Sequence, residues 1–133
     1  MRLHHVGIVV EDLAKYGEAY GKFLGLSVDS PAYHDPIQKV HIQFWKDGGG
    51  NLLELIEPAA PDSPVHGVLK KGGGLNHLCY EVDDLDEEVR LALEQGAISA
   101  SPVAPAVAFS GRRVAFVFFP KLDLVEFLEA ERR

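Results

Sequence analysis

The sequence predicts an α+β fold made of two tandem β-α-β-β-β modules. Residues 3–13 match residues 75–85, residues 52–57 match residues 124–129, and both pairs are offset by 72 residues. Each half of the chain also shows the same order of segments: an apolar run, a stretch with helical spacing, then three extended pieces. A unit used twice within 133 residues is expected to form a single domain of two packed modules.

The first module covers about residues 1–58 and begins with an apolar, β-branched run that predicts a strand over residues 3–10. Glu11 and Asp12 begin a helix whose apolar positions recur at helical spacing, and Gly25 ends it. The remaining elements are extended segments near residues 26–30, 39–45 and 51–57, with the glycine-rich residues 47–50 as a hairpin loop.

A turn-rich linker over about residues 59–73, with one or two helical turns at 65–70, separates this module from the second. The second module, about residues 74–133, repeats the order of the first. Its predicted elements are a strand over 75–82, a helix over 84–95, and extended segments near 98–100, 106–109 with 113–119, and 124–128.

Composition is that of an ordinary soluble protein, with 47% apolar and 25% charged residues. The 13 basic and 20 acidic residues give a net charge of −7, which argues against a nucleic-acid surface. No apolar run approaches the length of a membrane span, and the N-terminus lacks a signal-peptide pattern. Cys79 is the only cysteine, so a cytoplasmic location is expected.

The duplicated segments place a histidine on the first strand of each module and a glutamate on the last. His5 matches His77, and Glu54 matches Glu126, all at the offset of 72. A carboxylate between apolar neighbours on a closed strand face costs several kcal/mol unless it meets a cation. Imidazole and carboxylate together suit a divalent ion such as Zn²⁺, Ni²⁺, Co²⁺ or Mn²⁺. The four residues therefore predict one metal site.

The other histidines are not counted in this site. His4 is expected to face away from His5, and its repeat partner is Asn76. The remaining three, His34, His41 and His66, are expected to be plain surface residues, although His41 lies on a predicted strand that could reach the cleft.

Several segments resemble the vicinal oxygen chelate superfamily, which includes glyoxalase I and methylmalonyl-CoA epimerase. They are HVGIVVEDL (5–13), LELIEP (53–58), GLNHLCYEVDDL (74–85), and VAFV (114–117) with VEF (125–127). The resemblance implies an open, barrel-like, eight-stranded sheet around the metal. It also implies that His5, Glu54, His77 and Glu126 are the metal ligands, a full set similar to that of bacterial glyoxalase I.

The resemblance implies a metal-dependent, glyoxalase I-type lyase or isomerase that converts a hemithioacetal to a 2-hydroxyacyl thioester. Glu126 is then the expected base, with Glu54 as ligand and second base. The expected substrate-binding residues are Gln43, Tyr80, Arg113 and Phe118; Arg2 and Arg112 are further anion partners, and Phe44 and Trp45 further wall residues.

Two alternatives stay open at this point. One is epimerisation of a coenzyme A thioester, as in methylmalonyl-CoA epimerase. Against it, the chain has Asn76-His77 where epimerases typically carry two adjacent histidines, and Phe119-Pro120-Lys121 where they have His-Pro-Lys. The other is a non-catalytic protein that binds a drug or metabolite. Under each reading the partner is a small molecule, with no nucleic acid or membrane, and a homodimer is expected.

Overall fold

The structure is a computed structural model that describes residues 1–131. By internal contacts the chain divides into two compact units. The N-terminal unit is His5–Asn76, and the C-terminal unit joins Met1–His4 to the residues from His77 onward. The unit boundaries fall inside two strands, β1 and β6, rather than in the predicted linker. The single-domain assignment stays a prediction.

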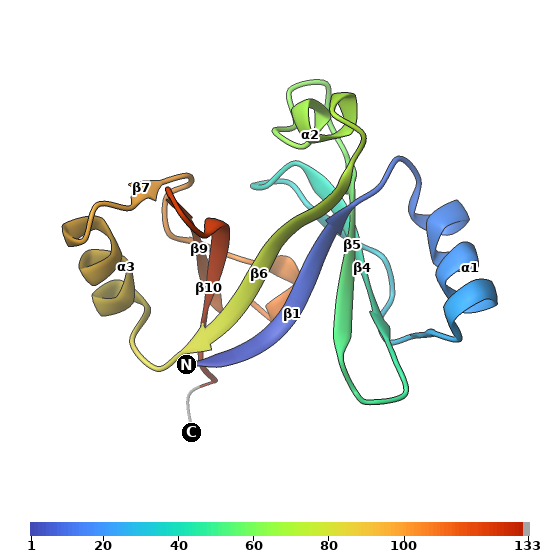
Figure 1. Ribbon diagram of the computed structural model, residues 1–133, viewed down its shortest axis with the longest axis horizontal. Helices are drawn as coiled ribbons and strands as arrows, with labels where there is room; N and C mark the ends of the chain where they lie inside the picture. Colours follow the sequence, from blue (N-terminus) through green and yellow to red (C-terminus); the bar gives the residue numbers. More distant parts are fainter. Residues whose placement is uncertain (132–133) are drawn as a thin grey trace. The chain divides into compact units, whose positions relative to one another are not determined.

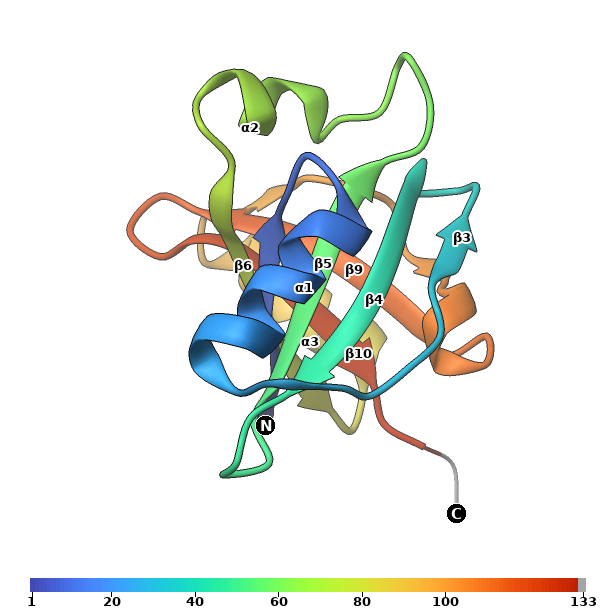
Figure 2. The same cartoon turned by 90° about the vertical axis from the view of Figure 1, so that its right-hand side faces the viewer.

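The N-terminal unit holds a mixed sheet with the strand order β2-β4-β5-β1, and β3 pairs with the outer side of β4. β1 and β5 are parallel, whereas β4 and β5 form an antiparallel hairpin. Helix α1 lies over β4 and β5 (Figure 2). The elements are β1 (Arg2–Val9), α1 (Leu13–Leu24), β2 (Ser27–Val28), β3 (Tyr33–Asp35), β4 (Val40–Lys46), β5 (Leu52–Pro58) and α2 (His66–Lys70).

The C-terminal unit repeats this plan with the strand order β6-β10-β9-β7, and β8 pairs with β9. β6 and β10 are parallel, and β9 and β10 are antiparallel. Helix α3 packs beside β9 and β10 (Figure 1). The elements are β6 (Gly74–Val82), α3 (Leu85–Glu94), β7 (Ile98–Ser99), β8 (Ala104–Pro105), a 3₁₀ turn (Val107–Phe109), β9 (Arg113–Phe119) and β10 (Asp123–Glu129).

Both long helices begin at the aspartates that the sequence indicated. The side chain of Asp12 accepts a hydrogen bond from the Lys15 amide at 2.8 Å, and Asp84 accepts one from the Glu87 amide at 3.1 Å. Such side-chain caps satisfy backbone donors that the first helical turn leaves open. Gly25 ends α1 with a left-handed φ of 71°, a conformation that glycine adopts at little cost.

The α+β class and the duplicated module are confirmed, but the count of eight strands is wrong. The described residues contain ten strands, because β3 and β8 were not expected. Val107–Phe109, which was expected to be extended, is a 3₁₀ turn. β3 and β8 have three and two residues, which is too short for an alternating pattern that would identify them.

Each unit has its own hydrophobic core between its sheet and its long helix. In the N-terminal unit Val10, Leu13 and Leu55 are buried together, with Trp45 packed against them. In the C-terminal unit the larger cluster consists of Val82, Leu85, Ala92, Ala97, Ala115, Val117, Val125 and Phe127. The helix-bearing face of each sheet is therefore the hydrophobic one, and the other face is where the duplicated polar residues lie.

No helix in the described part of the chain has the length and apolar character that crossing a bilayer would require.

Candidate functional site

The N-terminal unit holds one of the two predicted imidazole–carboxylate pairs. Nε2 of His5 on β1 lies 3.7 Å from Oε1 of Glu54 on β5. The two strands are parallel neighbours, with Gly7 opposite Glu54, so His5 and Glu54 lie on the same face of the sheet. Both side chains are buried, with 0% of the imidazole and 8% of the carboxylate side chain exposed.

The C-terminal unit holds the second pair in the same arrangement. Nε2 of His77 on β6 lies 3.2 Å from Oε1 of Glu126 on β10. Cys79 stands opposite Glu126 in the parallel register, as Gly7 stands opposite Glu54. The side chains are again buried, at 1% and 3% exposure. The two pairs are thus local copies of each other, as the repeat predicted.

A phenylalanine completes each copy. The Phe44 ring meets the His5 ring edge-on, with centroids 5.3 Å apart, and Phe116 meets His77 in the same way at 5.1 Å. Phe44 pairs with Glu54 across the β4–β5 hairpin, and Phe116 pairs with Glu126 across β9–β10. Phe44 was expected to be a wall residue and Phe116 was not, although Phe116 lies at the same offset of 72 from Phe44.

The residue types of each pair fit a divalent transition metal. Nitrogen of imidazole and oxygen of carboxylate are ligands that Zn²⁺, Ni²⁺ or Co²⁺ accept. A carboxylate buried as deeply as Glu126 costs several kcal/mol unless a cation lies beside it. One imidazole and one carboxylate supply two ligands, whereas structural zinc sites use four and catalytic sites three plus an open position. Each unit by itself therefore offers two candidate metal ligands.

If the buried pairs hold a metal ion, Phe116→Leu is expected to weaken zinc binding by up to about tenfold, the lower end of what hydrogen-bonded partners that orient a metal-ligating imidazole contribute. Leucine removes the ring edge that holds the His77 imidazole in place. The measurement is calorimetric titration of metal-depleted protein with Zn²⁺.

The matched control is Phe119→Leu on the same strand. Phe119 contacts Phe127 in the core on the helix-bearing face, with centroids 6.4 Å apart. This variant should lose stability but keep the zinc affinity of the parent. Equal losses of zinc affinity in the two variants would show that Phe116→Leu acts through a general loss of packing and not through the contact with His77.

Three of the proposed substrate-binding and wall residues lie on the helix-bearing faces, away from the imidazole–carboxylate pairs. Gln43 pairs with Leu55 in the β4–β5 register, and its Nε2 donates a hydrogen bond to the Ser30 carbonyl at 3.1 Å. Trp45 and Tyr80 pack against the two hydrophobic cores. Their expected place in the substrate cleft is corrected, because alternation along each strand turns them to the other side.

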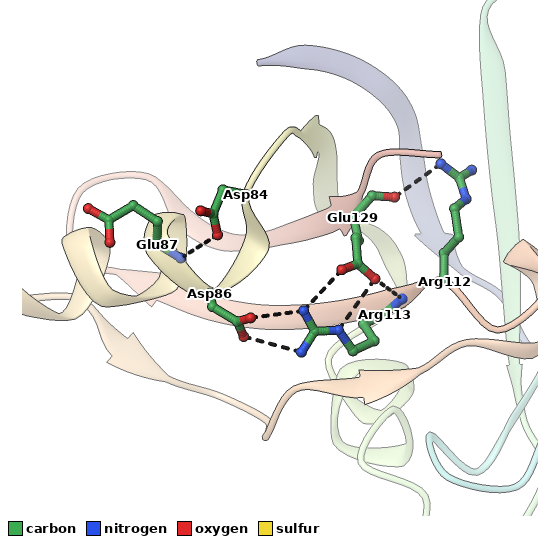
Figure 3. A network of polar contacts seen from close by, with 6 residues as sticks. All are labelled: Asp84, Asp86, Glu87, Arg112, Arg113 and Glu129. Atoms are coloured by element: carbon green, nitrogen blue, oxygen red, sulfur yellow. Dashed lines mark hydrogen bonds and ion pairs between the residues drawn. The ribbon is translucent and has the colours of Figure 1, made fainter. Parts of the chain in front are cut away.

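Arg113 is also placed differently from the prediction. Its guanidinium binds Asp86 of α3 at 2.9 Å and Glu129 of β10 at 3.0 Å, so two carboxylates already neutralise it (Figure 3). These two carboxylates raise the Arg113 pKa further above its usual value, and the hydrogen bonds that Arg113 donates to Glu129 contribute most. These ion pairs tie α3 to the sheet, and the expected role of Arg113 as a substrate anchor stays a prediction.

The other two arginines share one carboxylate. Arg2 forms an ion pair with Glu81, and Arg112 binds the same carboxylate at 3.0 Å. Arg112 also donates a hydrogen bond to the Glu129 carbonyl oxygen at 3.1 Å (Figure 3). All three arginines that sequence analysis considered for anions thus have carboxylate partners within the C-terminal unit.

We expect Glu81→Gln to lower the free energy of unfolding by about 1 kcal/mol at neutral pH, the scale of a partly exposed ion pair. Arg2, followed by Arg112, holds the pKa of the Glu81 carboxyl below its usual value. A lowered folded-state pKa gives stability that is present above the unfolded-state pKa of about 4 and is lost as the pH falls through the folded value.

The measurement is denaturant unfolding of parent and variant between pH 7 and pH 2, where the difference should shrink below about pH 4. The control is Glu87→Gln, since the Glu87 carboxylate pairs with Arg90 on the exposed side of α3. A Glu81→Gln deficit that is the same at every pH would contradict the electrostatic account.

Phe118 lies on the same face of its sheet as the imidazole–carboxylate pair, and its role as a wall residue stays a prediction. It follows Phe116 by two residues on β9 and so shares the face that Phe116 presents to His77. Its side chain is partly exposed, as a wall residue of an accessible site should be. Of the histidines that were set aside, His4 contacts Phe109, and His66 Nε2 lies 2.8 Å from the Ala60 carbonyl oxygen.

A family model described as the glyoxalase/bleomycin resistance protein/dioxygenase superfamily matches residues 4–116. An ethylmalonyl-CoA/methylmalonyl-CoA epimerase of Cereibacter sphaeroides is 33% identical over 118 residues, covering 87% of each chain. The human mitochondrial methylmalonyl-CoA epimerase is 35% identical over 118 residues, which cover 87% of this chain and 65% of the human protein.

Solved structures give the same result. The methylmalonyl-CoA epimerase of Mycobacterium tuberculosis matches with a TM-score of 0.83 at 26% identity, over 98% of this chain and 89% of that one. A variant of the Streptomyces coelicolor methylmalonyl-CoA epimerase, in complex with 2-nitronate-propionyl-CoA, matches with a TM-score of 0.81 at 25% identity over 99% of both chains. The chain belongs to the glyoxalase/bleomycin resistance protein/dioxygenase superfamily, that is, the vicinal oxygen chelate superfamily, and is related within it to the methylmalonyl-CoA epimerases.

Proposed function

We propose that this protein is a metal-dependent epimerase that inverts the α carbon of a branched, carboxylated acyl-coenzyme A such as methylmalonyl-CoA. The observation that carries the proposal is the duplicated, buried imidazole–carboxylate pair in a chain 33% identical to an ethylmalonyl-CoA/methylmalonyl-CoA epimerase. This replaces the glyoxalase I assignment as the main reading, because the relatives reported above favour coenzyme A thioesters over hemithioacetals.

The proposal includes one divalent ion held jointly by His5, Glu54, His77 and Glu126. Three observations support it. Each unit supplies half a ligand set, the two halves are related by the same repeat offset, and both carboxylates are buried where a cation would compensate their charge. When bound, the ion would supply Lewis-acid stabilisation of the negative charge that develops on the thioester oxygen.

The chain's own part in the reaction is proton transfer. In the proposed reaction a carboxylate accepts the proton from the α carbon, and the electron pair of that C–H bond delocalises into the thioester carbonyl. A proton then returns to the same carbon from the opposite face, so product and substrate differ only in configuration. Glu126 is the proposed base, and Glu54, its repeat partner, is the proposed second acid–base group.

The proposal includes fewer substrate-binding residues than the sequence suggested. Phe118 remains a proposed wall residue because it shares the Phe116 face of β9. Gln43, Tyr80 and Arg113 are not included, since their side chains serve the helix-bearing faces. A homodimer remains a prediction, and sedimentation equilibrium of the full chain would test it.

The decisive experiment offers one epimer of methylmalonyl-CoA in D₂O to protein loaded with Co²⁺, Ni²⁺ or Zn²⁺. Deuterium incorporation at the α carbon together with formation of the other epimer is the expected result. The comparison substrate is the methylglyoxal–glutathione hemithioacetal. Its conversion to a thioester, without epimerisation of the coenzyme A ester, would return the assignment to glyoxalase I. Tight metal binding without turnover of either substrate would instead favour a binding protein.

A further inference from the structure

We propose that His34 and His41 form a second metal site, a two-histidine clip across strands β3 and β4 of the N-terminal unit. The two imidazole rings lie with centroids 4.9 Å apart and planes inclined by 42°. They are directly opposite each other in the antiparallel register of β3 and β4. Directly opposed residues of an antiparallel pair project from the same face of the sheet, so both rings are available to one ion.

This pair is separate from the buried site of the proposed function. Along β4, His41 alternates with Phe44, which faces the His5–Glu54 pair, and so lies on the opposite, helix-bearing face. His34 is exposed and His41 is half-buried, so hydrated ions in solution can reach the rings. Among residues 1–131, the two imidazoles make no hydrogen bond or ion pair, only the ring contact with each other.

The surrounding backbone holds the two strands in register. The buried carboxylate of Asp35, next to His34, accepts hydrogen bonds from the Ile37 and Gln38 amides, each at 3.0 Å. These bonds fix the turn that joins β3 to β4. A chelate whose ligands are already held together loses less conformational entropy on binding than one that must be assembled. The fixed turn therefore favours binding of one ion by both rings.

The charges near the pair also favour a cation. Glu57 stands opposite His41 on β5, so His34, His41 and Glu57 form a row across three strands. One oxygen of the Glu57 carboxylate accepts a hydrogen bond from the Leu13 amide at 2.7 Å, so α1 fixes the orientation of this carboxylate. Glu57 therefore adds negative charge near the two histidines but is not proposed as a metal ligand. Lys39, the nearest lysine in the joining turn, forms an ion pair with Asp62.

Two neutral imidazoles select borderline metals. By the usual order of affinities Cu²⁺ binds such a pair most tightly, followed by Ni²⁺ and Zn²⁺, with water filling the remaining positions. With two protein ligands this site should bind more weakly than a site with four. A bound ion is expected to stabilise the pairing of the three-residue edge strand β3 with β4, because a ligand that binds only the folded arrangement stabilises that arrangement.

The test is a calorimetric titration of full-length protein that already carries one equivalent of Zn²⁺. A second, weaker class of about one Zn²⁺ per chain is expected. His34→Gln and His41→Gln should each weaken that class at least tenfold, and His66→Gln, which alters a histidine on α2, should leave it unchanged. Glu126→Gln should also leave it unchanged, so failure of the buried site and failure of this clip can be told apart.

Cu²⁺ electron paramagnetic resonance gives an independent readout. The parent protein should show coupling to two imidazole nitrogens at the second site, and each single variant should show one. The proposal is overturned if the preloaded parent binds no second ion. It is equally overturned if the second class persists with unchanged affinity in the His34→Gln/His41→Gln double variant. Both residues are exposed or half-buried, so circular dichroism should confirm that the variants fold.

Discussion

Glu126→Gln is expected to lower the rate of α-proton exchange by about a thousandfold for the epimer of methylmalonyl-CoA whose α proton faces Glu126, within the range that a positioned general base contributes. Glutamine keeps the size and one oxygen of the side chain but cannot accept a proton at neutral pH. The fold should survive, because the substitution removes a buried negative charge and leaves the neighbouring Phe116 and His77 in place. The measurement is deuterium exchange at saturating substrate, with zinc content determined on the same sample.

Zinc content matters because Glu126 is also a proposed ligand. A variant that loses both metal and activity would not distinguish the two roles, so the comparison has to be made at metal concentrations that saturate the variant. Restored metal occupancy with exchange still about a thousandfold slow is the expected result. Exchange that returns with the metal would contradict the assignment of Glu126 as the base and leave it as a ligand.

Glu54→Gln provides the matched variant, because Glu54 occupies the equivalent place in the other unit. If the two carboxylates act on opposite faces of the α carbon, each variant should fail to invert configuration. Each should nevertheless exchange the proton of the one epimer that its remaining carboxylate faces. Glu54→Gln that inverts both epimers at the parental rate would remove Glu54 from the acid–base pair.

The duplicated site could be predicted because each candidate residue in one module has a counterpart of the same type in the other module. One histidine on a strand carries little information, whereas His5 with His77 and Glu54 with Glu126 share one offset. The same argument would have found Phe116 from Phe44. Tyr80 could likewise have been excluded, since it lies three residues after His77 on one strand and therefore on the other face.

Gln43 and Arg113 could not be excluded in the same way. Their faces depend on how β4 registers with β5 and β9 with β10, and that register is set by the geometry of the joining turns. The turn after β4 is built by Asp47, whose carboxylate accepts the Gly49 and Asn51 amides. A one-residue change in such a turn would exchange the two faces, and composition alone does not fix it.

A glyoxalase and an epimerase are harder to tell apart from the sequence than the residues of the buried pairs are to find. Both reactions need a base and the stabilisation of negative charge on one oxygen, so the residues of the buried pairs are compatible with either reaction. Discrimination depends on what binds the rest of the thioester, and those contacts involve loops and side chains without a fixed motif. Asn76 and Phe119 differ from the typical epimerase residues, yet the relatives described above are epimerases.

Gly17→Ala is expected to lower the free energy of unfolding by about 1–2 kcal/mol, although alanine is the better helix former by about 1 kcal/mol. Gly17 lies in α1 where the helix meets Trp45 of β4. A Cβ at this position would lie 2.5 Å from Cζ2 and 2.9 Å from Cε2 of the indole. A rigid ring packed against Val10, Leu13 and Leu55 cannot move aside without disturbing the core, so the overpacking cost exceeds the helical gain.

Gly21→Ala, one turn later in the same helix, should have the opposite sign. A Cβ there would meet the Leu26 carbonyl oxygen at 3.5 Å and the indole Cζ3 at 3.6 Å, which are ordinary contacts. Only the helical gain remains, so this variant should be more stable than the parent by about 0.5–1 kcal/mol. Urea unfolding followed by the fluorescence of Trp45, the single tryptophan of the chain, measures both changes at the contact itself. Stabilisation by both alanines would mean that α1 can move away from β4 without disturbing the core, and the close packing of Gly17 against Trp45 would then not determine the stability of this unit.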